Sequence, residues 1–192
     1  MLYLSMSKNY FILTFPRSGS HFLREYMIQA TGKFLLSSHE YEDYLKIQDV
    51  VKDNTITILR NPTDTITSLS VIIKHSRKND NQENILDQSF VDDAKAMYLG
   101  FYKDIVPKIT HIIDYEKLIA NPKDVIKSIS KKLRLELITT EYKNRLVDSP
   151  ESDYLVTSTT SQDYYIFKEL VDNEDLTECW EIYNDSMKLV NI

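Results

Sequence analysis

The sequence has little glycine and almost no cysteine. Its 192 residues include three glycines, five prolines and one cysteine, Cys179. A single cysteine excludes an intrachain disulfide and a C-x-x-C metal site, so a reducing compartment is the simpler assumption. No apolar run approaches the roughly 20 residues of a membrane span, and "MLYLSMSKNYFILTF" lacks a basic leader followed by a long apolar stretch. We therefore expect a soluble intracellular protein without a membrane span, most simply a cytoplasmic one.

The chain also lacks an excess of positive charge. Lysine and arginine number 23 against 29 aspartates and glutamates, which gives a formal net charge of −6. This balance argues against a general nucleic-acid or membrane-surface binder, so any site for an anion must be local. A hydrophobic content of 42% over this length is enough for one core. We expect a single domain over residues 1–192.

Short apolar runs alternate with helical patterns along the chain. The runs predict strands at 10–15, 55–59 and 110–114, and apolar residues at three- and four-residue spacing predict helices at 19–31, 62–75 and 122–133. Gly32 should cap the first helix, while Asn61 and Asn121 each precede a proline at a helix start. The polar stretch 74–88 is predicted to be a loop, and 139–192 a helical C-terminal part. The alternation predicts an α/β fold with a mainly parallel central sheet flanked by helices.

Two segments of the sequence share one arrangement. "ILTFPRSGS" and "ITILRNPTDT" each run from an apolar strand through an arginine to a helix start. Parallel strands end at the same edge of a sheet, where ligands bind, so Arg17 and Arg60 should lie at one edge. The turn at 16–20 also points backbone N–H groups and the positive end of a helix at one spot, which suits an anion. An ordinary turn and a surface ion pair are the alternative interpretations.

Three stretches resemble motifs of the sulfotransferase family. "TFPRSGSHFL" is similar to its 5′-phosphosulfate loop T-Y-P-K-S-G-T-T-W-L, and "RNPTDTITS" to its 3′-phosphate motif R-x-P-x-D-x-x-x-S. "IIDYEKLIANPKDVIKSI" resembles the Y-E-D-L-x-x-N-P strand and helix, and the three occur in the family's order over residues 10 to about 133. The resemblance implies a P-loop NTPase-like sulfotransferase fold. It also implies an enzyme that moves a sulfuryl group from 3′-phosphoadenosine 5′-phosphosulfate (PAPS) to a hydroxyl by in-line displacement, releasing 3′-phosphoadenosine 5′-phosphate (PAP) without a metal.

The resemblance also implies which residues bind the donor. They are Arg17, Ser18, Gly19, Ser20, His21, Phe22, Arg60, Ser68 and Tyr115. Arg17 is implied as a catalytic cation on the leaving phosphate, where its planar fork suits phosphate oxygens. Arg60 and Ser68 are implied to hold the 3′-phosphate. Phe22 replaces a tryptophan that stacks on adenine, and Tyr115 is expected either near the adenine or in the core.

Sulfuryl transfer to a hydroxyl also needs a base for the departing proton. His39 follows "FLLSS" and precedes the Arg60 strand by about the separation of the family's Lys-x-His segment, which implies His39 as a catalytic residue. Glu40 or Glu42 is the alternative, because carbohydrate and tyrosyl-protein sulfotransferases use a glutamate. Ser37 stands where the lysine of Lys-x-His would be, so one cation of that segment is missing.

The last third of the sequence departs from the family. The R-K-G-x-x-G-D-W-K segment that closes over the donor is absent. The candidate residues for contacting the nucleotide instead are Thr157, Ser158, Ser161 and Tyr164. A following helical pattern with Leu176, Trp180 and Tyr183 as its packing face is interpreted as structural.

Two other functions remain open from the sequence. A P-loop kinase-like phosphotransferase would need G-x-x-x-x-G-K-[ST], whereas this loop has a single glycine with Arg17 before it. A nucleotide-binding protein without transfer chemistry is the second. The acceptor is expected to be a small molecule or a carbohydrate of unidentified kind, and no nucleic-acid partner is expected.

Overall fold

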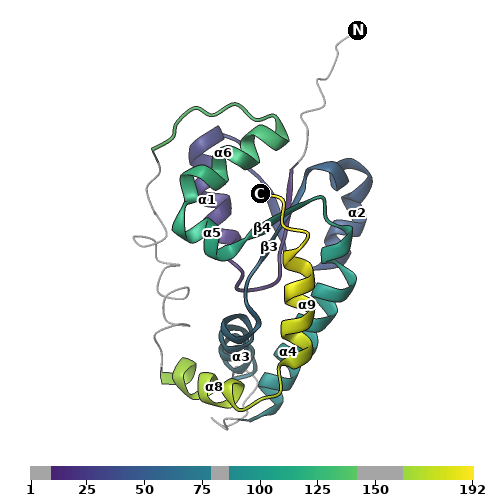
Figure 1. The fold of residues 1–192 in the computed structure, drawn as a ribbon, viewed down its shortest axis with the longest axis vertical. Helices are drawn as coiled ribbons and strands as arrows, with labels where there is room; N and C mark the ends of the chain where they lie inside the picture. Colours follow the sequence, from purple (N-terminus) through teal and green to yellow (C-terminus); the bar gives the residue numbers. More distant parts are fainter. Residues whose placement is uncertain (1–9, 79–86, 142–161) are drawn as a thin grey trace.

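Four parallel strands form the centre of the protein, in the order β2-β1-β3-β4 (Figure 1). They are β1 Phe11–Leu13, β2 Leu36–Ser38, β3 Thr55–Leu59 and β4 His111–Asp114. The structure is a computed structural model and describes residues 10–78, 87–141 and 162–192. The prediction of an α/β fold with a parallel sheet is confirmed, and the three predicted strands occur with two of them shortened.

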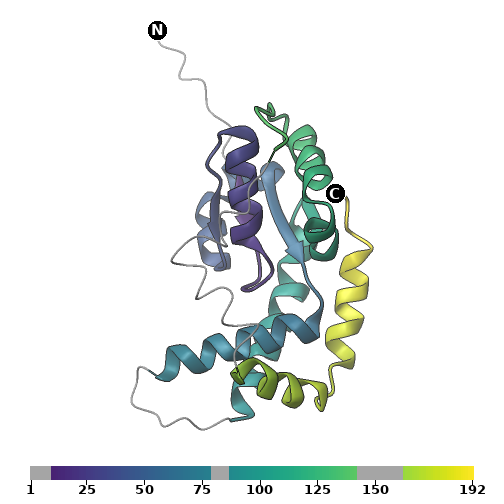
Figure 2. The ribbon, with the colours of Figure 1, turned by 90° about the vertical axis from the view of Figure 1, so that its left-hand side faces the viewer.

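Helices cover both faces of this sheet. Their bounds are α1 Ser20–Thr31, α2 Tyr41–Val51, α3 Pro62–Lys78, α4 Ser89–Asp104, α5 Tyr115–Ala120, α6 Pro122–Leu133, α8 Gln162–Asp172 and α9 Thr177–Met187, with short 3₁₀ turns η1 Lys52–Asn54 and η2 Val106–Lys108. In Figure 1, α1, α5 and α6 lie on one side of the strands, and α2, α4 and α9 lie on the other. The helices α3 and α8 lie beyond the carboxyl ends of the strands, as Figure 2 shows from the side.

Alternate residues of the strands contribute to two apolar cores, one on each face of the sheet. Ile12, Ile56 and Ile113 pack with residues of α1 and α6, whereas Leu13 and Leu59 pack with residues of α2, α4 and α9. Every residue of β1 and β3 is buried, as expected for parallel strands with helices on both faces. The apolar runs in the sequence therefore reflect burial on two sides.

The predicted helix ends are partly correct. Gly32 ends α1 in the left-handed conformation with φ 63°, and its N–H donates to Ile28 O at 2.8 Å. Asn61 caps α3, because its Oδ1 accepts from the N–H of Asp64 at 2.9 Å. Asn121 also precedes a helix, but its side chain makes no capping bond. Its backbone N–H donates to Lys117 O and so closes α5.

Two predictions for polar and C-terminal segments need correction. The loop predicted at 74–88 is wrong for residues 74–78, because α3 continues to Lys78, and residues 79–86 lie outside the described residues. Leu176 and Tyr183 are buried as predicted, but Trp180 is 39% exposed and Cys179 takes its place in the core. The buried residues 176, 179 and 183 follow three- and four-residue spacing. The buried face of the helix therefore includes Cys179, the residue before the tryptophan, and not the tryptophan itself. Thr157, Ser158 and Ser161 lie outside the described residues.

The outer edge of β4 is covered by two residues that follow α9. The N–H groups of Asn191 and Ile192 both donate to Ile112 O, at 3.2 and 3.3 Å. The side chain of Asn191 accepts from Ile112 N at 3.2 Å and donates to Thr110 O at 2.8 Å. This edge of the sheet is thus hydrogen-bonded although no further strand lies there in the described residues. Over the same residues, none of the helices is both long and apolar enough to cross a membrane.

Candidate functional site

The loop between β1 and α1 contains two residues in the left-handed region. Arg17 has φ 68° and Gly19 has φ 92°. Ser18 lies between them and is buried, and both its N–H and its hydroxyl donate to Phe15 O, at 3.3 and 2.6 Å. Helix α1 then starts without a side-chain cap and without an acidic residue in its first turn. The positive end of α1 is therefore not neutralised by its own first turn.

Arg17, Ser68 and Arg60 meet at the carboxyl edge of the sheet. The Nε of Arg17 donates to Ser68 Oγ on α3 at 2.9 Å. One terminal guanidinium nitrogen of Arg60, which directly follows β3, donates to Arg17 O at 2.8 Å. Because β1 and β3 are parallel neighbours, the residues after them arrive at one place. The two strand-to-helix junctions singled out in the sequence thus form one cluster.

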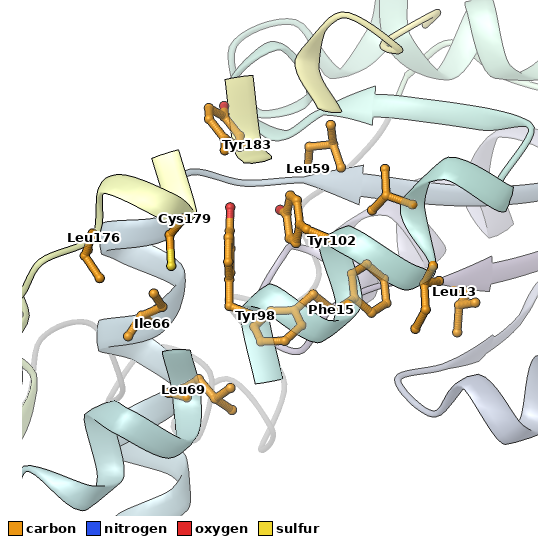
Figure 3. Packing of buried hydrophobic residues seen from close by; sticks show 14 of the residues in the cluster. Leu13, Phe15, Leu59, Ile66, Leu69, Tyr98, Tyr102, Leu176, Cys179 and Tyr183 are labelled. Atoms are coloured by element: carbon orange, nitrogen blue, oxygen red, sulfur yellow. The ribbon is translucent and has the colours of Figure 1, made fainter. Parts of the chain in front are cut away.

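Two tyrosines of α4 hold the backbone of Arg60. Tyr98 and Tyr102 both donate to Arg60 O, at 3.1 and 3.0 Å, and Tyr102 OH also lies 2.9 Å from Arg60 N. Their rings stack with centroids 4.1 Å apart, and Figure 3 shows the two rings side by side in the core. Burial raises the pKa of both hydroxyls above the ordinary value, so they remain protonated donors. Sequence reasoning missed this pair, although its i, i+4 spacing was readable.

The side chain of Arg60 lies between Tyr115 and the loop. Its Cζ is 4.6 Å from the centre of the Tyr115 ring. The same ring packs on Gly19, since a Cβ built there would meet Tyr115 Cε2 at 2.9 Å. The Nε of Arg60 is buried and has no hydrogen-bond partner among the described residues. A buried charged donor without an acceptor is unfavourable, and an anion's oxygen would satisfy it.

The other implied donor-binding residues lie on the first turn of α1. Ser20 is buried, whereas His21 and Phe22 are half-buried. The Phe22 ring stacks on Tyr26 with centroids 4.3 Å apart, so one face of it is already covered. The phenol of Tyr164 on α8 has its pKa raised by burial and by Asp64, while Arg60 opposes the rise. Tyr164 is thus the member of the predicted C-terminal set that the described structure brings towards Arg60.

His39 lies directly after β2, beside the start of the loop. Its Nδ1 is 2.8 Å from Thr14 O and 3.4 Å from Thr14 Oγ1. A carbonyl oxygen can only accept, so Nδ1 carries the hydrogen and Nε2 keeps a lone pair. This arrangement lets Nε2 accept a proton. The alternative bases Glu40 and Glu42 are both exposed.

The remaining histidines have structural contacts. His111 begins β4, with Nε2 at 3.1 Å from Asp53 O, and desolvation lowers the pKa of its imidazole. His75 lies 3.4 Å from a carboxylate oxygen of Asp163. Within residues 10–78, 87–141 and 162–192, no group of histidine, cysteine and acidic side chains is arranged to hold a metal ion.

A separate hollow of about 470 Å³ lies between the start of α3 and the α8–α9 turn. Its lining includes Asp172, Glu174, Asp175 and Glu181. Four carboxylates make this hollow unfavourable for a phosphate-bearing ligand. The cationic edge around Arg17 and Arg60 is therefore the better candidate site for an anion.

Comparisons with known proteins add no relative to this description. A scan against protein-family models, a search of curated proteins and a search of solved structures each found no match.

Proposed function

We propose that this protein is a sulfotransferase with a P-loop NTPase-like fold, which moves a sulfuryl group from PAPS to a hydroxyl of an acceptor. The observation that supports this most directly is the junction of Arg17, Ser68 and Arg60 at the edge of the parallel sheet. Each of these residues belongs to a stretch that resembles a phosphate-binding motif of that family. The Nε of Arg60, which lacks a hydrogen-bond partner among the described residues, adds a reason for an anion to bind there.

The residues present fit a nucleotide with a phosphate on both the 3′ and the 5′ oxygen of its ribose. Arg60 and Ser68 hold the 3′-phosphate in this proposal, since Ser68 Oγ accepts from Arg17 and can still donate its own hydrogen. The backbone of residues 18–21 and Arg17 hold the 5′-phosphosulfate. Tyr115, which already contacts Arg60 and Gly19, borders the adenine.

The chemistry proposed is a direct displacement at sulfur. The bound donor supplies the sulfuryl group. His39 accepts the acceptor's hydroxyl proton at Nε2 while the acceptor oxygen forms a bond to sulfur. The bond between sulfur and the 5′-phosphate oxygen breaks, and Arg17 stabilises the negative charge that develops on that oxygen. Thr14 O keeps the imidazole in the tautomer that this step requires.

Binding of PAP tests the proposal before any acceptor is known. We expect PAP to raise the unfolding temperature more than AMP, which lacks the 3′-phosphate, and more than ATP with magnesium. Arg60→Ala should weaken the binding of PAP by about 10- to 100-fold, as expected for loss of a charge-assisted contact, and should change the binding of AMP little. Both tyrosine bonds go to the backbone of Arg60, so they survive this substitution.

Arg134→Ala is the matched control. Arg134 is exposed at the end of α6. The neighbouring Leu133 O accepts from Tyr10, which precedes β1, so this control lies at the opposite edge of the sheet. Equal losses of affinity for PAP and AMP in Arg60→Ala would show that Arg60 does not bind the 3′-phosphate. Stronger stabilisation by ATP with magnesium than by PAP would favour the phosphotransferase, and PAP binding without transfer from labelled PAPS would favour a nucleotide-binding protein.

A further inference from the structure

A second basic cluster lies between α1 and β2, apart from Arg17 and Arg60. One terminal nitrogen of Arg24 is 3.4 Å from Ser37 Oγ, and the other is 3.4 Å from His21 Nδ1. His21 and Arg24 are three residues apart on α1, so they share one face of the helix. Arg24 is half-buried, and it points at the strand that ends beside His39.

The strand side of this cluster faces α1. Leu35 is buried in the same core as Leu23 and Met27 of α1. Ser37 pairs in register with Ile12, whose side chain belongs to the same core, so the Ser37 side chain lies on the α1 side of β2, and His39 follows it two residues later. Two residues of a strand span about 6.6 Å. One small molecule can therefore contact both His39 and the Arg24 guanidinium, which lies beside Ser37.

Arg24 has no acidic partner in the part of the chain that the structure describes. The ion pairs found there use lysine or histidine, such as Lys46 with Asp43 on the nearby α2. The two contacts of Arg24 are long and go to a hydroxyl and an imidazole. A half-buried guanidinium with five donors and only such contacts can take two oxygens of an anion in a bidentate manner.

We propose that Arg24, with His21 beside it, binds an anionic group of the acceptor, so that the substrates are hydroxyl compounds bearing a carboxylate, sulfate or phosphate. This inference rests on the proposed sulfotransferase function. The donor's phosphates are assigned to Arg17 and Arg60, which leaves Arg24 for the acceptor. The acceptor's anionic group lies at Arg24 and its hydroxyl lies at His39, about one strand repeat away.

The test compares acceptors that differ in charge. Transfer from labelled PAPS is measured to glucose, glucuronic acid, glucose 6-sulfate and glucose 6-phosphate, and to 4-hydroxyphenylacetamide with 4-hydroxyphenylacetate. In the wild type we expect kcat/KM for the anionic members to exceed that of their neutral partner by about 10-fold or more. The three charged glucose derivatives show whether carboxylate, sulfate or phosphate fits best.

Variants of Arg24 test whether the preference for anionic acceptors depends on this residue. Arg24→Gln should remove it mainly through a higher KM, Arg24→Lys should keep part of it, and Arg24→Glu should favour the neutral acceptors. Binding of the same acceptors to the PAP complex, measured by calorimetry, should follow the same order. Stabilisation by PAP should be unchanged in all three variants, because Arg24 is not assigned to the donor.

The outcomes separate the two proposals. Equal kcat/KM for charged and neutral acceptors in the wild type overturns the role of Arg24 and leaves the sulfotransferase standing. A preference that persists in Arg24→Gln does the same. If PAP does not bind and none of the acceptors is sulfated, the sulfotransferase function falls, and the acceptor class falls with it.

Discussion

Gly19 is the residue at which the loop geometry tolerates least change. Its φ of 92° disfavours every residue with a Cβ, and the Cβ position is also occupied by the ring of Tyr115. Arg17 tolerates a similar φ two residues earlier. The difference is that the structure leaves room for a side chain at Arg17, which extends to Ser68.

Gly19→Ala should therefore lower the free energy of unfolding by about 1–3 kcal/mol, from backbone strain and a clash. In a Tyr115→Ala background the clash disappears, so the same substitution should cost less. Urea denaturation of the four proteins in this cycle measures the difference. Gly100→Ala on α4 is the control, because a Cβ there meets nothing within 4 Å, and it should stabilise by up to about 1 kcal/mol. Equal costs in both backgrounds would show that Tyr115 does not restrict Gly19.

His39 is the residue on which the transfer chemistry depends. His39→Asn should reduce kcat by about 100- to 10,000-fold while stabilisation by PAP survives, because a base acts on the acceptor and not on the donor. Transfer from labelled PAPS measures the first effect and thermal unfolding the second.

Glu40→Gln and Glu42→Gln are the controls for this assignment. Both carboxylates are exposed, and we expect near-normal kcat in each variant. A large loss in either one, with His39→Asn active, would move the base to that glutamate.

At the scale of elements, an ion pair connects α3 to α8. Lys74 Nζ lies 2.7 Å from Asp163 Oδ1, and the two side chains are 10% and 23% exposed. His75 approaches the other carboxylate oxygen at 3.4 Å. This pair fixes the helix that carries Tyr164 next to the helix that carries Ser68.

Asp163→Ala leaves the Lys74 ammonium buried without its partner, so we expect a loss of about 1–4 kcal/mol of unfolding free energy. The double variant Lys74→Met/Asp163→Leu should recover most of it, because the buried charge is gone. Lys188→Met, in an exposed pair with Asp185, should change stability by less than about 1 kcal/mol. Chemical denaturation measures all three, and a double variant as unstable as Asp163→Ala would contradict the explanation.

The elements show how far local patterns predict this fold. Helices α1 and α6 were predicted to within one residue, since their apolar spacing and end residues agree with each other. The end of α3 was predicted too early, because the polar residues from Lys74 onwards resemble a loop. The side chain of Lys74 pairs with an aspartate 89 residues away in the sequence, a contact that no local pattern contains.

At the scale of the whole molecule, the meeting of Arg17 with Arg60 was predictable because parallel strands deliver their ends to one edge. The tyrosines that hold Arg60 were not predictable, because Tyr102 is 42 residues from it in sequence and reaches it only through packing of α4. The contact of Arg24 with Ser37 was missed for a similar reason, since β2 must first pair beside β1. Sequence motifs thus indicated the candidate site residues, whereas the contacts that hold them in place come from tertiary packing.

The single cysteine reports on the integrity of this packing. Cys179 is fully buried near Tyr98 and Tyr183 (Figure 3), and burial raises the pKa of its thiol to about 11. Because the thiolate is the reactive form, iodoacetamide should label Cys179 at least about 1,000-fold more slowly in native buffer than in urea. Mass spectrometry of timed samples measures both rates. Labelling at the rate of a free thiol in native buffer would mean that α9 does not stay docked.

The hydrogen bonds of Asn191 and Ile192 to β4 limit how copies of this molecule can associate through the sheet. A strand from another molecule would find the β4 edge taken, whereas the outer edge of β2 has no strand beside it in the described residues. Stacking of sheets edge to edge into a fibre needs two open edges on every copy, so the bonds of Asn191 and Ile192 to β4 oppose that mode of assembly.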